Sequence, residues 1–217
     1  RYGSSITTII DNSKTYRMDD NVPLVAVGVN EDVLVDSNPI IANPNCSTIQ
    51  MVLALKPFQD LYGIKSVIVT TLQSVSGSGS KSISNLEHEV RDYLQKGEIS
   101  PGYYSEQIGF NVIPYIGSIH DNGYADEEKK MGDETRKIFQ KENLPVISTT
   151  LRVPTFFSHF ETIFVKTLGD VDLNRIRKVM ENNQYLRVLD HPDEGYPMPI
   201  SSAFTDIVDV GRFRYGN

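Results

Sequence analysis

Cysteine is almost absent from this sequence: 217 residues contain one thiol, Cys46, and no tryptophan. A single cysteine cannot form an internal disulfide, so the sequence predicts a protein of a reducing compartment, the cytoplasm. No further ligands stand near Cys46 at the spacing of a zinc site, and we expect no metal.

A basic excess and long apolar runs are also lacking. The formal net charge is −7, and no block of Lys and Arg occurs, which argues against non-specific nucleic-acid binding. The apolar run at 64–72 is interrupted by Lys65 and Ser66 and is far shorter than the ~20 residues of a membrane span. The first residues show no signal-peptide pattern. We therefore expect neither nucleic acid nor a membrane as a partner.

What is present is an ordinary globular composition with 39% hydrophobic residues, sufficient for a substantial core. Short β-branched runs predict strands, and apolar residues at helical spacing predict helices. The second half lacks strict strand–helix alternation, so we predict an α+β domain with a mixed sheet. Residues 97–117 hold two prolines without a period, which is typical of a functional or partner-wrapping loop. The expected strands are 5–10, 22–29, 66–75, 146–153, 161–166 and 207–212, and the expected helices are 48–58, 82–96, 124–142 and 173–182.

Both ends of the sequence run through strand-like segments. It starts without Met on "SITTIIDNS" and stops after "DIVDVGRFRYGN". We expect a piece of a larger protein, or one that lacks segments.

Cys46 precedes an apolar, helix-forming run. If the helix begins at about Ser47, the thiol lies at a helix N-terminus, where free N–H groups and the dipole favour a thiolate. The same N–H groups could stabilise an oxyanion. A buried structural cysteine is the alternative, and this context leaves both open.

A nucleophilic thiol needs a proton acceptor, and His159 has the most unusual setting among the four histidines. It lies in the apolar segment "RVPTFFSHFET", seven residues after Arg152. A buried guanidinium requires an anion. In one continuous strand this odd separation would put the two side chains on opposite faces, so a bend near Pro154 is needed. The other histidines occupy surface-like contexts: His88, His120 and His191.

Three further features could bind charged groups. Glu127 and Lys130 share a helix face, where a plain surface ion pair is the simpler interpretation. Arg17 follows a polar loop, within reach of an anion or solvated. The stretch "SVSGSG" follows a predicted strand and could approach a phosphate, but it lacks the full dinucleotide fingerprint.

Together these pieces resemble the aspartate-semialdehyde dehydrogenase family. The residues between 8 and 166 carry the family's motifs in order and spacing, with "DVGRFR" as a later echo. Asn-Cys-Ser is followed by Gln73, 27 residues after Cys46, and then by Arg-Val-Pro with His159 seven residues beyond Arg152. The matching segments are "IIDNSKTYRMDDNVPLV", "IIANPNCSTIQMVLALKPF", "VIVTTLQSVSGSG", "FNVIPYIGSIHDNGYADEEKKMGDETRKI" and "LRVPTFFSHFE".

The resemblance implies NADP-dependent reductive dephosphorylation of aspartyl phosphate to aspartate semialdehyde, in lysine, threonine, methionine and isoleucine biosynthesis. Cys46 would be the nucleophile that forms a thioacyl intermediate, and phosphate would be the co-substrate of the reverse reaction. His159 matches the acid/base histidine, and Gln73 matches the glutamine that orients the substrate.

The resemblance also assigns binding residues. Arg152 matches the arginine that grips the substrate carboxylate, and Glu127 matches the partner of its amino group. The remaining binding positions are Lys130, Arg17 and Asn45 for substrate or phosphate, and Ser76 and Gly77 for the cofactor.

The family's organisation implies two parts and a homodimer. Residues 1–45 would hold the last strands of an incomplete Rossmann-type nucleotide-binding domain. Residues 46–217 would form a catalytic and dimerisation domain like that of glyceraldehyde-3-phosphate dehydrogenase. Most of the NADP site would be missing, so we expect little or no turnover of a small-molecule substrate by this chain alone.

Two departures and two alternatives accompany this interpretation. Gly28 stands where the family usually has Glu, and Ser158-His159-Phe160 stands where it has Gly-His-Ser/Thr. N-acetyl-glutamyl-phosphate reductase fits less well, because its cysteine usually precedes tyrosine. A non-catalytic dimerisation module or an inactive paralogue is the alternative from a different class.

Overall fold

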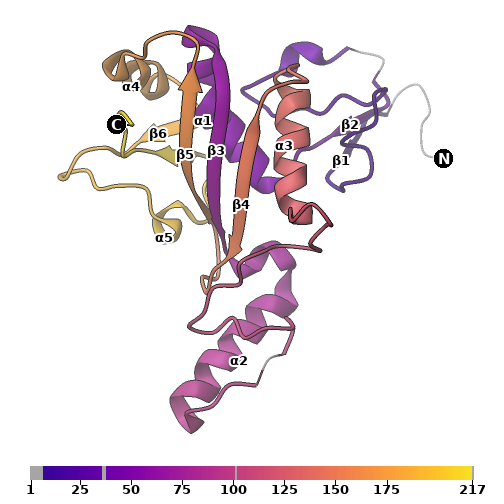
Figure 1. Ribbon diagram of the computed structural model, residues 1–217, viewed down its shortest axis with the longest axis vertical. Coiled ribbons are helices and arrows are strands. Elements are labelled where there is room, and N and C mark those ends of the chain that lie inside the picture. The colour runs from indigo at the N-terminus through magenta and orange to yellow at the C-terminus, as the bar shows by residue number, and fades with distance from the viewer. Residues whose placement is uncertain (1–6, 36–37, 101, 217) are drawn as a thin grey trace.

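The computed structural model describes residues 7–35, 38–100 and 102–216, and a three-stranded sheet lies at its centre (Figure 1). The central strand β3 (Ile64–Gln73) runs parallel to β4 (Val146–Arg152) and antiparallel to β5 (His159–Thr167). The sheet is therefore mixed, which confirms the α+β prediction. The strand predicted at 66–75 from its apolar, β-branched residues is confirmed as β3.

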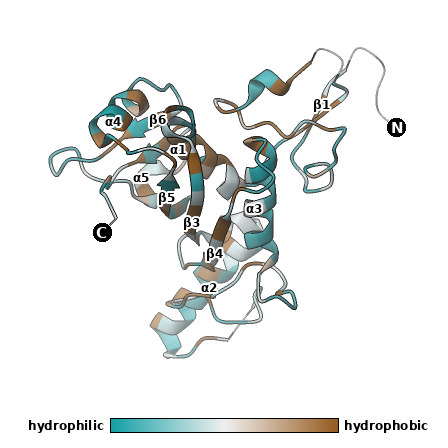
Figure 2. Ribbon diagram, turned by 45° about the horizontal axis from the view of Figure 1, so that its top comes forward, coloured by the Kyte–Doolittle hydropathy of each residue, from teal (hydrophilic) through white to brown (hydrophobic). Residues whose placement is uncertain are grey.

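Helices cover one face of this sheet. They are α1 (Cys46–Tyr62), which packs on β5 and β3, and α3 (Asp126–Ile138), which packs on β4. Alternate residues of β3 point into this layer, where Val67 and Val69 meet Met51 of α1. Figure 2 shows apolar segments along β3 and β4. Because side chains alternate along a strand, the same alternation brings Gln73 to the helix side at the end of β3.

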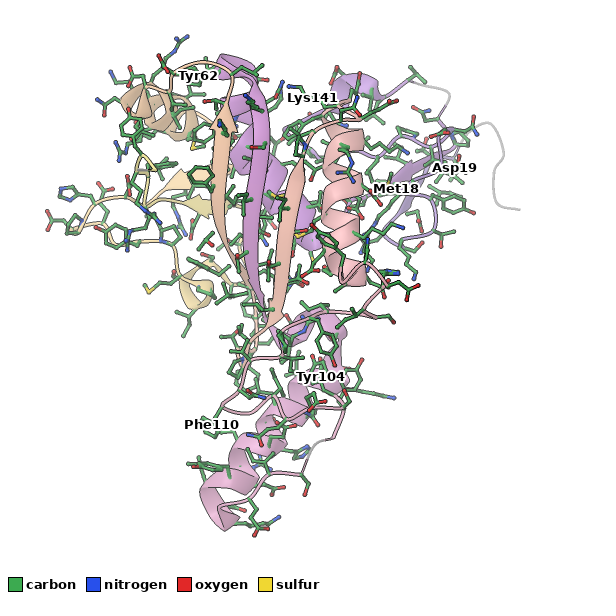
Figure 3. All side chains as sticks on the ribbon, in the orientation of Figure 1. Met18, Asp19, Tyr62, Tyr104, Phe110 and Lys141 are labelled. Carbon is green, nitrogen blue, oxygen red and sulfur yellow. The ribbon has the colours of Figure 1, made fainter. Side chains whose placement is uncertain are left out.

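The end of β3 leads into a 3₁₀ turn, η2 (Val75–Ser78), and then into α2 (Ser80–Lys96), which extends away from the sheet (Figure 1). The described part of the predicted loop, 97–100 and 102–117, forms no helix or strand and packs along α2, where Tyr104 and Phe110 lie (Figure 3). Its backbone is held by Glu89, whose Oε2 accepts hydrogen bonds from the N–H groups of Ile108 and Gly109. This packing supports the turn that carries Ser76 and Gly77.

Two small parallel strand pairs flank the central layer. No helix among residues 7–35, 38–100 and 102–216 is long and apolar enough to cross a membrane. The flanking elements are β1 (Ile9–Asp11) with β2 (Ile40–Ala42), β6 (Leu186–Val188) with β7 (Val208–Val210), η1 (Glu31–Val33), α4 (Leu173–Glu181) and α5 (Pro199–Ser202).

The strand predicted at 22–29 is wrong. This segment forms a single bridge, from Leu24 to Ala42, and then turns. The Asn30 side chain stabilises the turn, since its Oδ1 accepts from Ala26 N–H and its Nδ2 donates to the Leu24 carbonyl. The apolar residues of this segment are mostly buried. Their backbone groups find hydrogen-bond partners in a turn and not in a strand ladder. Ser5 and Ile6, at the start of another predicted strand, lie outside the described residues.

Gly28 occupies a position where the backbone and its neighbours favour glycine. Its φ is +84°, in the region that favours glycine, and a Cβ there would overlap the Tyr185 ring and crowd Leu53. A larger side chain would require this turn to rearrange.

The α2 packing makes a stability prediction. Leu86 is 1% exposed against Val75 and Ile108, whereas Leu94 of the same helix is 75% exposed. We expect Leu86→Ala to lower the free energy of unfolding by about 2–5 kcal/mol through lost burial and a cavity. The control Leu94→Ala should change it by less than about 0.5 kcal/mol. Chemical denaturation measures both, and equal effects would contradict this packing.

Candidate active site

Cys46 is the first residue of α1, and Asn45 is the N-cap. The Asn45 Oδ1 accepts from the N–H of Ser47 at 2.9 Å and of Thr48 at 3.4 Å, which satisfies two of the helix's free donors. The predicted start of the helix is thus correct to within one residue. Asn45 is 8% exposed, and Cys46 beside it is exposed to solvent.

Gln73 pairs with Arg152 across the parallel ladder and with His159 across the antiparallel ladder. Residues directly opposite one another on neighbouring strands present their side chains on the same face. All three therefore lie in one row on the helix side of the sheet. The chain crosses over β3 between residues 153 and 158, and this crossover provides the bend on which the sequence interpretation depended.

Cys46 and His159 line one pocket of about 340 Å³. Gly77 forms part of its wall, and a Cβ there would lie 3.1 Å from Arg152 Nη1 and 3.3 Å from His159 Nε2. The turn therefore approaches these two side chains closely because position 77 has no side chain. The full lining comprises Cys46, Gln50, Ser76, Gly77, Ser158 and His159.

Glu127 is near enough to act electrostatically on Cys46 and is 5% exposed, so its pair with Lys130 is not a plain surface ion pair. Its Oε2 accepts from Lys130 Nζ at 3.1 Å. Its Oε1 accepts from Asn45 Nδ2 at 2.8 Å and from Gln73 Nε2 at 3.4 Å. The carboxylate thus connects α3 with the N-cap of α1 and with the end of β3.

Arg17 belongs to a second buried ion pair, next to the first. Its Nη1 donates to Glu134 Oε1 at 3.0 Å and its Nη2 donates to the Asn12 carbonyl, while its buried Nε has no partner. The other Glu134 oxygen accepts from the Asn45 backbone N–H at 2.6 Å. Arg17 is therefore coupled through Glu134 to the N-cap of the cysteine helix.

The surroundings of Cys46 raise the pKa of its thiol, first through loss of hydration and then through the negative charge of Glu127. The Ser47 amide, at the start of α1, acts in the opposite direction but is outweighed. The helix N-terminus thus favours the thiolate as predicted, yet the resting thiol is harder to ionise than a free cysteine.

His159 is positioned by the start of the turn. Its Nδ1 accepts a hydrogen bond from the Ser74 backbone N–H at 3.2 Å, and the Ser74 hydroxyl lies 3.4 Å from the same nitrogen. Burial lowers the pKa of the imidazole, and the nearby Arg152 charge lowers it further. The neutral imidazole is therefore favoured at neutral pH.

Two residues of the site were missed from the sequence. Gln50 lines the pocket one helical turn after Cys46, and its Nε2 donates to Glu161 Oε1 at 2.8 Å. Burial raises the pKa of Glu161 well above its usual value. Two sequence signals could have indicated them. Gln50 follows Cys46 at helical spacing, and Glu161 follows His159 at the two-residue spacing of a strand face. Among the described residues, no group of three or more His, Cys, Asp and Glu could hold a metal.

Comparison with known proteins gives these residues a context. Residues 55–217 match the family model "Semialdehyde dehydrogenase, dimerisation domain". The chain is 42% identical over 218 residues to aspartate-semialdehyde dehydrogenase of Aquifex aeolicus. This alignment covers 99% of this chain and 64% of that protein. The chain belongs to the aspartate-semialdehyde dehydrogenase family. It spans about 62–64% of the length of the curated relatives it matches first.

Solved structures of aspartate-semialdehyde dehydrogenases share the fold. Aspartate semialdehyde dehydrogenase II of Vibrio cholerae, complexed with ASA, aligns with a TM-score of 0.92 and 39% identity over 96% of this chain and 62% of that chain. The Candida albicans enzyme with NADP aligns with a TM-score of 0.70 and 23% identity over 97% of this chain and 62% of that chain, which shows the fold alone.

Ser158 and Phe160, which flank His159, depart from the family's usual Gly-His-Ser/Thr and lie in different surroundings. Phe160 pairs with Leu72 and lies on the opposite face of the sheet from His159, away from the pocket. Ser158, where the family usually has Gly, lines the pocket with φ at +67°. Serine is thus held in a conformation that glycine adopts more easily.

The charge of Glu127 makes a testable prediction about the thiol. We expect Glu127→Gln to lower the Cys46 pKa and so to increase the alkylation rate by iodoacetamide near pH 7, because a nearby negative charge opposes ionisation. The control is Glu142→Gln, at an exposed position after the same helix. The pH dependence of alkylation measures the shift, and an unchanged or higher Cys46 pKa would contradict the electrostatic effect.

Proposed function

We propose that this chain is the catalytic and dimerisation part of an NADP-dependent aspartate-semialdehyde dehydrogenase. Cys46 and His159 come from different elements and line one pocket, and this single observation carries the proposal. The family membership supplies the substrate: aspartyl phosphate in the reductive direction, and aspartate semialdehyde with phosphate in reverse.

Cys46 is the nucleophile in this proposal. Its thiolate attacks the acyl carbon of aspartyl phosphate, and departure of phosphate leaves a thioacyl group on the sulfur. His159 lines the same pocket as Cys46, where it acts on the reacting oxygen. Gln73, fixed between Arg152 and His159 in the sheet, orients the substrate beside the sulfur.

The charged groups match an amino acid that carries a phosphoryl group. Arg152 binds the α-carboxylate as a planar, permanently charged donor. Glu127 binds the ammonium group, and Lys130 then lies close to phosphate or carboxylate. Arg17, with its unpartnered Nε, contributes to phosphate binding, and Asn45 positions Glu127 through their 2.8 Å hydrogen bond.

Ser76 and Gly77 are the residues of this chain that would hold the reactive end of NADP. They fit because the absence of a side chain at position 77 brings the turn's backbone to the pocket wall. Bound NADP supplies the hydride acceptor or donor. The relatives are longer than this chain, and we expect the rest of their length to supply the nucleotide-binding domain.

We further propose that the uncovered face of the central sheet forms a homodimer. Three cross-strand rows lie there, and Ile68, Ile147 and Phe164 of the first row are each about half exposed. In Figure 1 no helix of the described chain lies over this face. A flat apolar face that is identical on two copies suits a two-fold contact. The other rows are Thr149–Thr70–Thr162 and Leu151–Leu72–Phe160.

The catalytic proposal is tested by phosphate- and NADP-dependent oxidation of aspartate semialdehyde. A polypeptide that contains this chain and has the length of its relatives should show activity, and Cys46→Ser should reduce kcat by about 10³-fold or more because the nucleophile is lost. The chain alone should show little or no turnover. Thr205→Ser, a similarly small change at an exposed site, is the control. Activity that survives Cys46→Ser at the wild-type rate would refute the mechanism.

The dimer is tested by the mass of the chain in solution. We expect the wild type to have twice the mass of one chain by light scattering. Thr70→Arg, in the central row, should weaken the dimer about 30-fold or more, because two desolvated arginines would meet across the two-fold axis. Gln95→Arg on the exposed surface of α2 should leave the mass unchanged. A Thr70→Arg dimer as tight as the wild type would place the contact elsewhere.

A further inference from the structure

Gln50 of α1 and Glu161 of β5 are joined by a hydrogen bond from Nε2 to Oε1, 2.8 Å long. Within the part of the chain that the structure describes, no other hydrogen bond joins these two elements. Their remaining contact is apolar, since Met51 of α1 and Ile163 of β5 belong to one hydrophobic cluster. Apolar packing is non-directional, whereas a hydrogen bond requires a defined distance and angle. This bond therefore determines how α1 is seated on β5.

Each of the two residues shares a face with a reacting residue. Gln50 follows Cys46 by four positions, which puts both side chains on the same side of the helix. Glu161 follows His159 by two positions, which puts both on the same face of the strand. Cys46, Gln50 and His159 all line the pocket. The hydrogen bond thus joins the two elements that carry the thiol and the imidazole, one step further along each.

The Glu161 carboxyl is enclosed between the sheet and α1. Glu161 pairs with Thr71, which pairs in turn with Thr150, and both threonines are fully buried. The Oε2 atom of Glu161 is buried without a hydrogen-bond partner, which would be costly for a carboxylate. Burial accordingly raises the pKa of Glu161 well above its usual value. The neutral carboxyl is favoured, so its role toward Gln50 is that of a hydrogen-bond acceptor and not that of a charge.

We propose that Glu161 is a positioning residue for the reaction at Cys46: its hydrogen bond to Gln50 fixes the first turns of α1 against β5 and so holds the thiol and the His159 imidazole at one pocket. Glu161 acts through Gln50 and does not touch the substrate. This inference rests on the proposed function for the reaction that the positioning serves.

Positioning of this kind affects turnover more than binding. Arg152 and Glu127, which bind the substrate in the proposed function, belong to β4 and α3 and not to the two elements that this hydrogen bond joins. A displacement of about 1 Å between reacting atoms can reduce a rate by about 10²-fold. Loss of the hydrogen bond should therefore lower kcat and leave KM nearly unchanged. An amide at position 161 keeps the acceptor oxygen and should preserve kcat.

Hydrogen exchange of the chain tests the contact without substrate. Glu161→Leu removes the acceptor and should speed exchange of the Gln50 backbone N–H by about tenfold or more. Gln59→Leu is the matched control, because the Gln59 Oε1 accepts from the Ile64 N–H at 3.0 Å at the other end of the helix. It should speed exchange at that end only. Unchanged exchange at Gln50 in Glu161→Leu would overturn the proposal.

The second measurement is the kinetics of a polypeptide that contains this chain and has the length of its relatives. Glu161→Leu should lower kcat for oxidation of aspartate semialdehyde by about 30-fold, with KM within about twofold of the wild-type value. Glu161→Gln should keep kcat within about threefold of the wild type, and Gln59→Leu should leave it unchanged. The positioning role would be wrong if Glu161→Leu turned over at the wild-type rate, or if Glu161→Gln were as slow as Glu161→Leu.

A second variant breaks the same hydrogen bond from the helix side. Gln50→Leu should reproduce the faster exchange in the first turns of α1 and the lower kcat, and it decides the proposal if Glu161→Leu does not fold. Wild-type exchange and turnover in Gln50→Leu would overturn the proposal. Inactivity of the unsubstituted polypeptide would refute the proposed function, whereas hydrogen exchange would still decide whether Glu161 seats α1 on β5.

Discussion

The double pairing of Gln73 is the constraint on which the site depends. The end of β3 is hydrogen-bonded to the end of β4 on one side and to the start of β5 on the other. This register aligns Arg152, Gln73 and His159 and directs the next residue, Ser74, toward both neighbours. A one-residue slip on either side would turn a functional side chain to the opposite face of the sheet. The backbone ladder therefore determines the chemistry of the pocket wall.

The cysteine side of the pocket depends on a different set of contacts. Asn45 caps α1 with its Oδ1, donates from Nδ2 to Glu127 and donates from its backbone N–H to Glu134. Because both carboxylates belong to α3, the start of the cysteine helix is fixed relative to that helix. The Glu127 hydrogen bond to Gln73 connects this unit to the sheet. Residues far apart in sequence thus share one hydrogen-bonded network around the start of the cysteine helix.

Local patterns predicted most of the regular structure, because apolar periodicity and the Asn-Cys-Ser cap are local properties of the chain. They failed at 22–29, where Gly28 and the Asn30 side chain favour a turn that burial alone does not reveal. The positions of Cys46 and His159 followed from motifs, but the Arg152–His159 alignment required the crossover of β3, which sequence separation argued against. No local sequence pattern indicated the role of Glu134, since its partners are 89 and 117 residues away.

The charges around the pocket explain why such a site suits an anionic ligand. Arg152 and Lys130 contribute two positive charges, and the Glu127 carboxylate contributes one negative charge. Burial raises the pKa of Glu161 well above its usual value, which favours the uncharged carboxyl, and burial lowers the pKa of His159, which favours the neutral imidazole. The two positive charges of Arg152 and Lys130 suit an anionic ligand. In the proposed function, the ammonium group of the substrate would lie at Glu127 and would reduce the field that opposes ionisation of the Cys46 thiol. Under that proposal, substrate binding and thiolate formation would favour each other.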